Sequence, residues 1–203
     1  MRELSTSLRF MMTTAKLDDI YKLGSAEPHE SACTFDKVFA RDLKAGSPQL
    51  CIASSGNQID LLETLLEHMP EPMWLLYVLV VPRGEGGNGR YQSTEPQSRQ
   101  EIQAFLGRFR NYLEADGRHN IWLKSEKGPA LLVFDRHNLI YAYGPIDEWA
   151  KALLELGWSE VERKAISLPD PHSHHYHAIF DDDAREVLSY MQWQHSPLRE
   201  QDQ

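Results

Sequence analysis

The run Trp74-Leu75-Leu76-Tyr77-Val78-Leu79-Val80-Val81 decides the fold class of this chain. Its side chains are apolar at every position, so a strand built from it suits the interior of a sheet that is covered on both faces. A second apolar run, 50–53, precedes it, and the residues between the two runs carry apolar side chains at helical spacing: Ile59, Leu62, Leu66 and Met69. Strand, helix and strand in this order predict a βαβ unit with a right-handed crossover.

The sequence that follows predicts further strands and helices around this unit. A glycine-rich loop over 82–92 leads to the clearest helix, which starts from a cap at Ser93 or Thr94 and runs to Leu113. Apolar runs on both sides of Asp135-Arg136-His137-Asn138 predict a β-hairpin with this stretch as its turn. The other expected elements are strands over 120–124, 130–134, 139–143 and, at a sheet edge, 160–168, and helices over 147–156 and 181–191.

Together these elements predict an α/β or α+β domain over residues 49–193. We expect a mixed, partly parallel β-sheet of about 5–6 strands, with helices packed on one or both faces. Residues 1–48 are expected to form a helical or irregular N-terminal preface. It would include a helix capped by Thr34, with an apolar face made of Phe35, Val38, Phe39 and Leu43. Residues 194–203 are expected to be a flexible tail.

The composition of the chain limits the kinds of molecule that we expect the protein to bind. The chain has 203 residues and a net charge of −9, which argues against binding to a nucleic-acid backbone. No apolar run approaches the roughly 20 residues that span a bilayer, so we expect no membrane role. The two cysteines, Cys33 and Cys51, form no C-x-x-C pair, which fits a reducing, cytoplasmic location. The acidic balance is compatible with a basic protein partner or a bound cation, and it is also what keeps an ordinary globular protein soluble. The partner we expect is another protein or a second copy of this chain.

The most concentrated chemistry lies in Pro169-Asp170-Pro171-His172-Ser173-His174-His175-Tyr176-His177, which holds four of the nine histidines. Imidazole is the commonest protein ligand for metals. In an extended chain, the first two of these histidines point to one face and the last two to the other. One strand therefore cannot direct all four at one ion.

A metal site here would use two of these histidines with a carboxylate or with a residue from elsewhere in the fold. Zinc or another divalent transition metal is the cofactor that such a site takes. A polar turn that binds no metal explains the same residues. The candidate ligands are His172, His174, His175, His177, Asp170 and Asp181.

A second candidate site lies between the first strand and its helix, at Ser54, Ser55, Gly56 and Asn57. Ligands of α/β sheets bind beyond the carboxyl ends of strands, and the N-terminus of a helix attracts anions. Arg83 and Arg90, which flank the glycine-rich loop, are candidates to hold the same anion. Ordinary helix capping also explains the residues at Ser54–Asn57, and a plain flexible connector explains the loop that carries the two arginines.

Three functions are compatible with these features, and the sequence leaves them open. The first, which we favour, is a non-catalytic protein that binds another macromolecule through an acidic surface. The second is a metal-dependent hydrolase that uses the His172–His177 cluster, where a metal would lower the pKa of a bound water. The third is an anion- or nucleotide-binding module at Ser54–Asn57.

Overall fold

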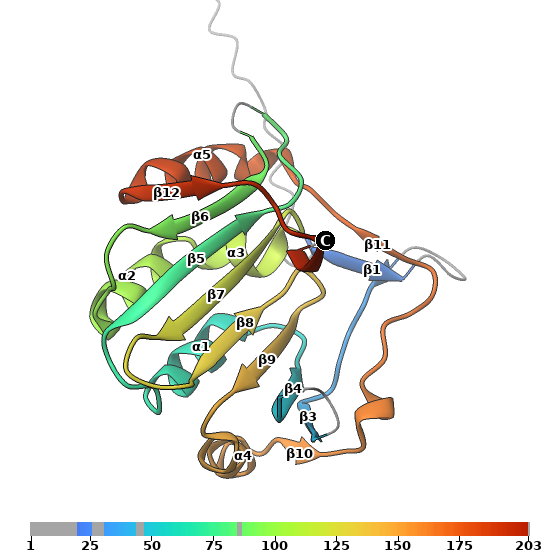
Figure 1. Cartoon of the computed structure of the whole chain (residues 1–203). Coiled ribbons are helices and arrows are strands. Elements are labelled where there is room, and N and C mark those ends of the chain that lie inside the picture. Colours follow the sequence, from blue (N-terminus) through green and yellow to red (C-terminus); the bar gives the residue numbers. More distant parts are fainter. Residues whose placement is uncertain (1–19, 26–30, 44–46, 85–86, 203) are drawn as a thin grey trace, which may run out of the picture.

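The computed structural model describes residues 20–25, 31–43, 47–84 and 87–202 as a mixed α/β fold built on one large sheet (Figure 1). Neighbouring strands of this sheet are antiparallel, except that β10 and β3 are parallel. In the described part of the chain it has nine strands, in the order β10 (Ser159–Glu160), β3 (Val38–Asp42), β4 (Gln49–Ala53), β9 (Leu139–Tyr143), β8 (Leu131–Phe134), β7 (His119–Ser125), β5 (Met73–Leu79), β6 (Gly89–Ser93) and β12 (Trp193–Ser196).

The helices share one apolar core with one face of this sheet. Alternation along β5 sends Met73, Leu75 and Tyr77 into that core. Trp149 is fully buried in the same core, and its Nε1 donates to the carbonyl of Leu65 at 2.9 Å. The helices are α1 (Gln58–Leu66), α2 (Arg99–Arg108), α3 (Arg110–Ala115), α4 (Ile146–Glu155) and α5 (Asp181–Tyr190).

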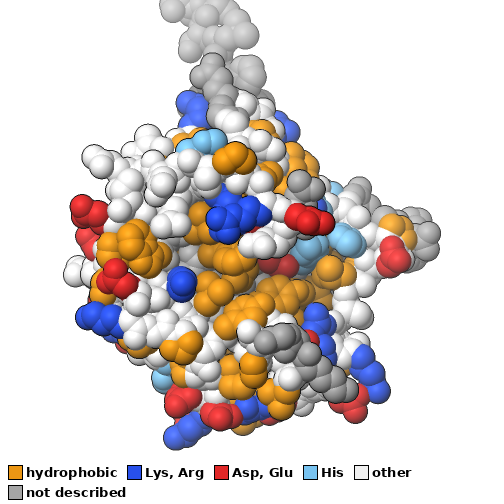
Figure 2. All heavy atoms as spheres, viewed as in Figure 1, with side chains coloured by type: hydrophobic (Ala, Val, Ile, Leu, Met, Phe, Trp, Pro, Cys, Tyr) orange, Lys and Arg blue, Asp and Glu red, His pale blue; other side chains and the backbone are white. Residues whose placement is uncertain are grey.

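The opposite face of the sheet is covered only in part. A smaller apolar cluster around Cys51 and Ile166 covers β3, β4 and the start of β9. Beyond it, a row of side chains crosses the strands through register pairs: Leu76, Trp122, Val133 and Tyr141. We call this row and its surroundings the open face; Figure 2 shows hydrophobic side chains gathered over its middle, with histidines beside them.

A second, three-stranded sheet lies beside the large one (Figure 1). Its strands, in order, are β11 (His172–His174), β1 (Leu23–Ser25) and β2 (Ser31–Ala32), and all its pairings are antiparallel. Three short 3-10 helices complete the described structure: η2 (Arg163–Ala165), η3 (Ala178–Phe180) and η4 (Glu200–Asp202). Among the described residues, the helices are all too short or too polar to cross a membrane.

Much of the expected architecture is confirmed. The strand over 50–53, the helix after it and the apolar strand at 74–81 correspond to β4, α1 and β5. The hairpin is β8 and β9, joined by the predicted turn. The βαβ unit differs in one respect: β4 and β5 run in the same direction, but β9, β8 and β7 lie between them.

The sheet is larger than expected because three strands come from segments without a clear strand pattern. The predicted helix at residues 34–43 is wrong. This segment forms β3, in which Phe39 faces the main core, Val38 contacts the smaller cluster, and Leu43 is 63% exposed beyond its end. β3 therefore joins residues from both sides of the boundary expected at residue 49 into one sheet.

The glycine-rich loop and the tail contain the other two additional strands. The loop ends earlier than expected, because residues 89–93 form β6. The tail expected from residue 194 instead continues β12 along β6, and Asp202 is buried beyond it. Two boundaries also differ. The first long helix begins after Ser98, which forms a capping box with Glu101, and the strand expected at 160–168 is reduced to the edge strand β10.

A candidate metal centre of three histidines

Pairing of β11 with β1 sets the direction of the histidine side chains. His174 lies opposite Leu23 and His172 opposite Ser25, so these two histidines share one face of the strand. The imidazole of His137 lies against the same face, with ring centroids 4.8 Å from His174 and 5.4 Å from His172. One nitrogen from each ring lies within 4.8 Å of the others. Three histidines from two distant segments therefore converge on one point.

The hairpin turn between β8 and β9 supplies His137. Asp135 organises this turn, because its Oδ1 accepts from the backbone N–H groups of His137 and Leu139, each at 2.9 Å. The other oxygen, Oδ2, lies 2.9 Å from His137 Nδ1. A carboxylate at this nitrogen fixes the Nδ1–H tautomer and leaves Nε2 free to bind a metal. The expected turn is thus correct, and it also carries a candidate ligand, His137, that was not predicted from the sequence.

His172 is oriented in a similar way by the backbone. Its Nδ1 lies 3.0 Å from the carbonyl oxygen of Pro169, which can only accept a hydrogen bond. The proton therefore belongs on Nδ1, and Nε2 is the nitrogen with a free lone pair. Two of the three rings thus have the outer partner that is common for histidines in metal sites.

His174 is the most unusual of the three. Both of its ring nitrogens are buried and have no hydrogen-bond partner in the described part of the chain. A buried polar atom without a partner costs about 1–3 kcal/mol. Burial first, and then the positive charge of Arg136, lower the pKa of His174 to about 3. The ring is therefore neutral at physiological pH, which is the form that binds a metal.

The spacing suits a small transition metal after a modest closure. Zinc lies about 2.0–2.1 Å from each histidine nitrogen, which places tetrahedral ligands about 3.3 Å apart. The three nitrogens are within 4.8 Å, so the widest pair must approach by up to about 1.5 Å. His172, at the start of β11, is the exposed one of the three residues. Three protein ligands leave a fourth position for water or substrate.

Close backbone packing holds the histidine segment in place. The N–H of Gly117 donates to the carbonyl of His175 at 2.9 Å, and the N–H of His175 donates to the carbonyl of Lys22 at 3.0 Å. A Cβ added at Gly117 would lie 2.8 Å from that Lys22 oxygen and 3.3 Å from the Cβ of His174. Glycine is therefore needed where this turn meets the histidine segment.

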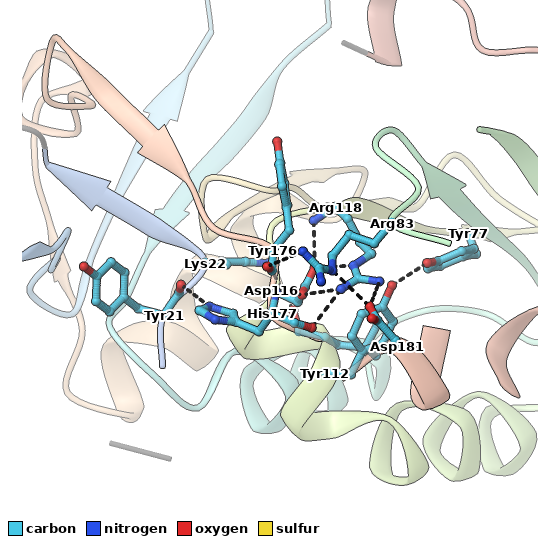
Figure 3. Close-up of polar contacts among 11 residues, drawn as sticks. Tyr21, Lys22, Tyr77, Arg83, Tyr112, Asp116, Arg118, Tyr176, His177 and Asp181 are labelled. Atoms are coloured by element: carbon cyan, nitrogen blue, oxygen red, sulfur yellow. Dashed lines mark hydrogen bonds and ion pairs between the residues drawn. The ribbon is translucent and has the colours of Figure 1, made fainter. Parts of the chain in front are cut away.

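A buried ion pair anchors the other end of the segment (Figure 3). Arg118 donates to both carboxylate oxygens of Asp116, at 2.7 and 2.9 Å, and its Nη2 also donates to the carbonyl of His177 at 3.0 Å. Asp116 in turn accepts from the backbone N–H of His177 at 2.8 Å. Asp181 bridges the guanidinium groups of Arg118 and Arg83, at 3.1 Å each. These contacts hold the segment at its His177 end and do not involve His137, His172 or His174.

The structure divides the predicted metal ligands into two groups. His172 and His174 join His137, whereas His175 and His177 lie with Tyr21 on the other side of the strand. The Nε2 of His177 lies 2.9 Å from the Tyr21 carbonyl, so it donates there. The predicted carboxylates are not in the cluster: Asp170 is exposed, and Asp181 pairs with the two arginines described above. The alternation of the four histidines was therefore predicted correctly, whereas the proximity of His137 was not predicted.

The side chains of the loop at Ser54–Asn57 make hydrogen bonds within the chain. The Ser54 hydroxyl donates to the Gly56 carbonyl, and the Ser55 hydroxyl donates to that of Phe35. Asn57 provides no side-chain cap for α1. The N–H of Ile59 in the first turn of α1 is already bound by the Glu114 carboxylate at 2.8 Å.

The two arginines of the anion hypothesis lie elsewhere. β4 and β5 are four strand positions apart, about 19 Å, so residues that follow β5 do not reach the loop after β4. Arg83 pairs with Asp181 beside a hollow of about 380 Å³, and Arg90 is buried against Asp202. The structure therefore does not bring these arginines together with Ser54–Asn57.

No protein-family model matches this chain, and no curated protein or solved structure matches it either. The geometry of the site is therefore the only basis for a functional proposal.

Proposed function

We propose that this protein is a metal-dependent hydrolase that holds one divalent transition metal ion, zinc in the first instance, at His137, His172 and His174. The observation that carries the proposal is His174, whose two buried nitrogens have no partner among the described residues, at a point where two other imidazoles converge. A metal ion would satisfy one of these nitrogens and would draw on rings that Asp135 and Pro169 already orient.

The open coordination position supports hydrolysis as the reaction class. Zinc held by three histidines lowers the pKa of a bound water to about 7 and polarises a carbonyl or phosphoryl oxygen. In hydrolysis, the water oxygen bonds to the acyl or phosphoryl centre, the bond to the leaving group breaks, and the leaving group takes the proton. The chain's own contribution is to keep His174 neutral by burial and to hold His137 in the Nδ1–H tautomer.

The non-catalytic binding protein is the alternative. Its acidic version predicts a concentrated negative patch, but acidic and basic side chains are interspersed on the face in Figure 2. That face therefore lends this version no support.

The metal is tested on tag-free protein that is first stripped with a chelator. We expect one zinc or cobalt ion per chain, with the intense visible spectrum of tetrahedral cobalt. His137→Ala and His172→Ala should each lose the ion, whereas the exposed His68→Ala should bind it as the wild type does. Wild-type protein that binds no ion, or His137→Ala that binds it unchanged, would overturn the site.

Hydrolysis is tested separately with 4-nitrophenyl acetate and bis(4-nitrophenyl) phosphate as probes. We expect turnover of at least one probe by the zinc-loaded protein, and its loss on stripping and in His137→Ala. Stoichiometric metal without turnover of either probe would overturn the hydrolase and favour a non-catalytic metal-binding protein.

A further inference from the structure

A pocket on the open face adjoins the histidine cluster. It has a volume of about 350 Å³, within the range of small-molecule sites. Trp122, Val133 and Tyr141 from three neighbouring strands form its apolar floor. Arg136 and His137 of the hairpin turn form one wall. The imidazole of His137 is thus shared between this pocket and the metal centre.

The pocket has polar atoms that the described part of the chain leaves without partners. Trp122 Nε1 and Arg136 Nε are buried donors with no acceptor, and Gln49 Oε1 is a buried acceptor with no donor. Gln49 is only 9% exposed and lines the same pocket. Buried polar groups are rarely left unpaired in native proteins, so three around one pocket indicate a ligand that pairs with them.

The charges around the pocket favour an anion. No carboxylate pairs with the Arg136 guanidinium in the described part of the chain. Asp135 is occupied by the hairpin turn and by His137. Asp202, which also lines the pocket, is held by Arg90 and by the backbone N–H of Arg199. Among the described residues that line the pocket, Arg136 therefore carries the positive charge that a ligand can neutralise.

We propose that this pocket binds a small aromatic oxyanion. Its ring would lie on Trp122 and Tyr141, and its anionic oxygens would face Arg136 beside the metal centre. Arginine presents a planar fork of N–H donors that matches a carboxylate or a phosphate, and the indole N–H adds a further donor. The placement of the oxyanion next to the metal rests on the proposed function, whereas binding in the pocket does not require the metal.

Isothermal titration calorimetry on metal-free, full-length protein tests this proposal. The probes are 2-naphthoate and 2-naphthyl phosphate, which separate the two oxyanion types, and the neutral 2-naphthamide. We expect saturable binding of at least one anion and at least tenfold weaker binding of the amide. Arg136→Gln should weaken anion binding by about 10- to 100-fold, and Trp122→Phe, which removes only the donor and some ring area, by a smaller factor.

The matched control is Arg185→Gln, because Arg185 is an exposed arginine paired with Asp182, outside this pocket. It should bind the anions as the wild type does. The proposal is overturned if neither anion binds saturably, if the amide binds as tightly as the anion, or if Arg136→Gln binds unchanged. Anion binding by a protein that takes up no metal would support the pocket and reject the hydrolase. Metal uptake without anion binding would reject the pocket alone.

Discussion

Replacing Asp135 by asparagine tests the orientation of the metal centre without removing a ligand. The Oδ1 of Asp135 accepts two backbone N–H groups of the turn, and an asparagine Oδ1 can keep both bonds. The other position, 2.9 Å from His137 Nδ1, changes from an acceptor to an NH2 donor. His137 can then pair with it only by placing its proton on Nε2, which is the nitrogen that the metal needs.

The expected loss follows from this conflict. To bind the metal through Nε2, His137 in the variant must carry its proton on Nδ1. The hydrogen bond from the asparagine NH2 is then lost, and this NH2 group faces the Nδ1–H, another donor. Mutation of a residue that orients a metal-binding histidine in this way typically lowers metal affinity by 10- to 100-fold, which corresponds to about 1.4–2.7 kcal/mol. The turn keeps its backbone hydrogen bonds, so we expect the melting temperature of the metal-free protein to change little.

The assay is competition for zinc against a chromophoric chelator at fixed pH, with melting of the metal-free proteins measured in parallel. Asp147→Asn is a matched control, since Asp147 is 84% exposed and pairs with Arg41 at the surface. Zinc affinity in Asp135→Asn equal to that of the wild type would refute the argument that this carboxylate orients His137. A large fall in melting temperature would show that Asp135 acts mainly through the turn.

Two further predictions concern buried ionisable side chains next to the histidine segment, those of Lys22 and Arg118. Lys22 is fully buried, and burial lowers its pKa from 10.5 to about 7. Between these two values the unfolded chain binds more protons, so the unfolding free energy should rise with pH, by up to about 5 kcal/mol in total. Urea titrations of Lys22→Met between pH 6.5 and 10.5 should lack this rise, and an identical pH profile would contradict the expectation. Arg118→Gln leaves the buried Asp116 carboxylate unpaired and should cost about 3–5 kcal/mol of unfolding free energy. Arg185→Gln is the control, because Arg185 pairs with Asp182 at the surface, and this variant should lose only about 0–1 kcal/mol of unfolding free energy. Equal losses in the two variants would contradict the stabilising role of the buried pair.

The elements that the sequence predicted are those with a strong local period. β5 and α1 have apolar patterns that match a strand and a helix, and both were predicted within a few residues. β3 was misassigned because Phe35, Val38 and Phe39 also match helical spacing. Only its pairing with β4 shows that alternate residues face opposite sides of the sheet.

Long-range charge pairing explains the other missed strands. Arg90 looks like a loop residue in the sequence, but it is buried in β6 because Asp202 pairs with it from a distant segment. β12 has little apolar alternation, and its position depends on β6 as a neighbour. No local pattern contains this information.

The sequence was enough to predict which segment carries the candidate site, but not that His137 is the third candidate ligand. Alternation along the histidine segment separated His172 and His174 from the other two histidines, as the structure has it. His137 lies in a turn that Asp135 explains completely, so nothing in that stretch pointed to a metal. Only the pairing of β11 with β1 brings the two segments together.

The placement of the three histidines gives an ion a mechanical role as well as a chemical one. His137 lies in the turn between two strands of the large sheet, whereas His172 and His174 belong to a strand of the small one. An ion bound to all three would cross-link the sheets and close the chain between residues 137 and 172 into a loop. Loop closure on this scale restricts the unfolded chain by about 3–4 kcal/mol when the link is a disulfide. A removable link of this kind would make the rigidity of the small sheet depend on the supply of metal.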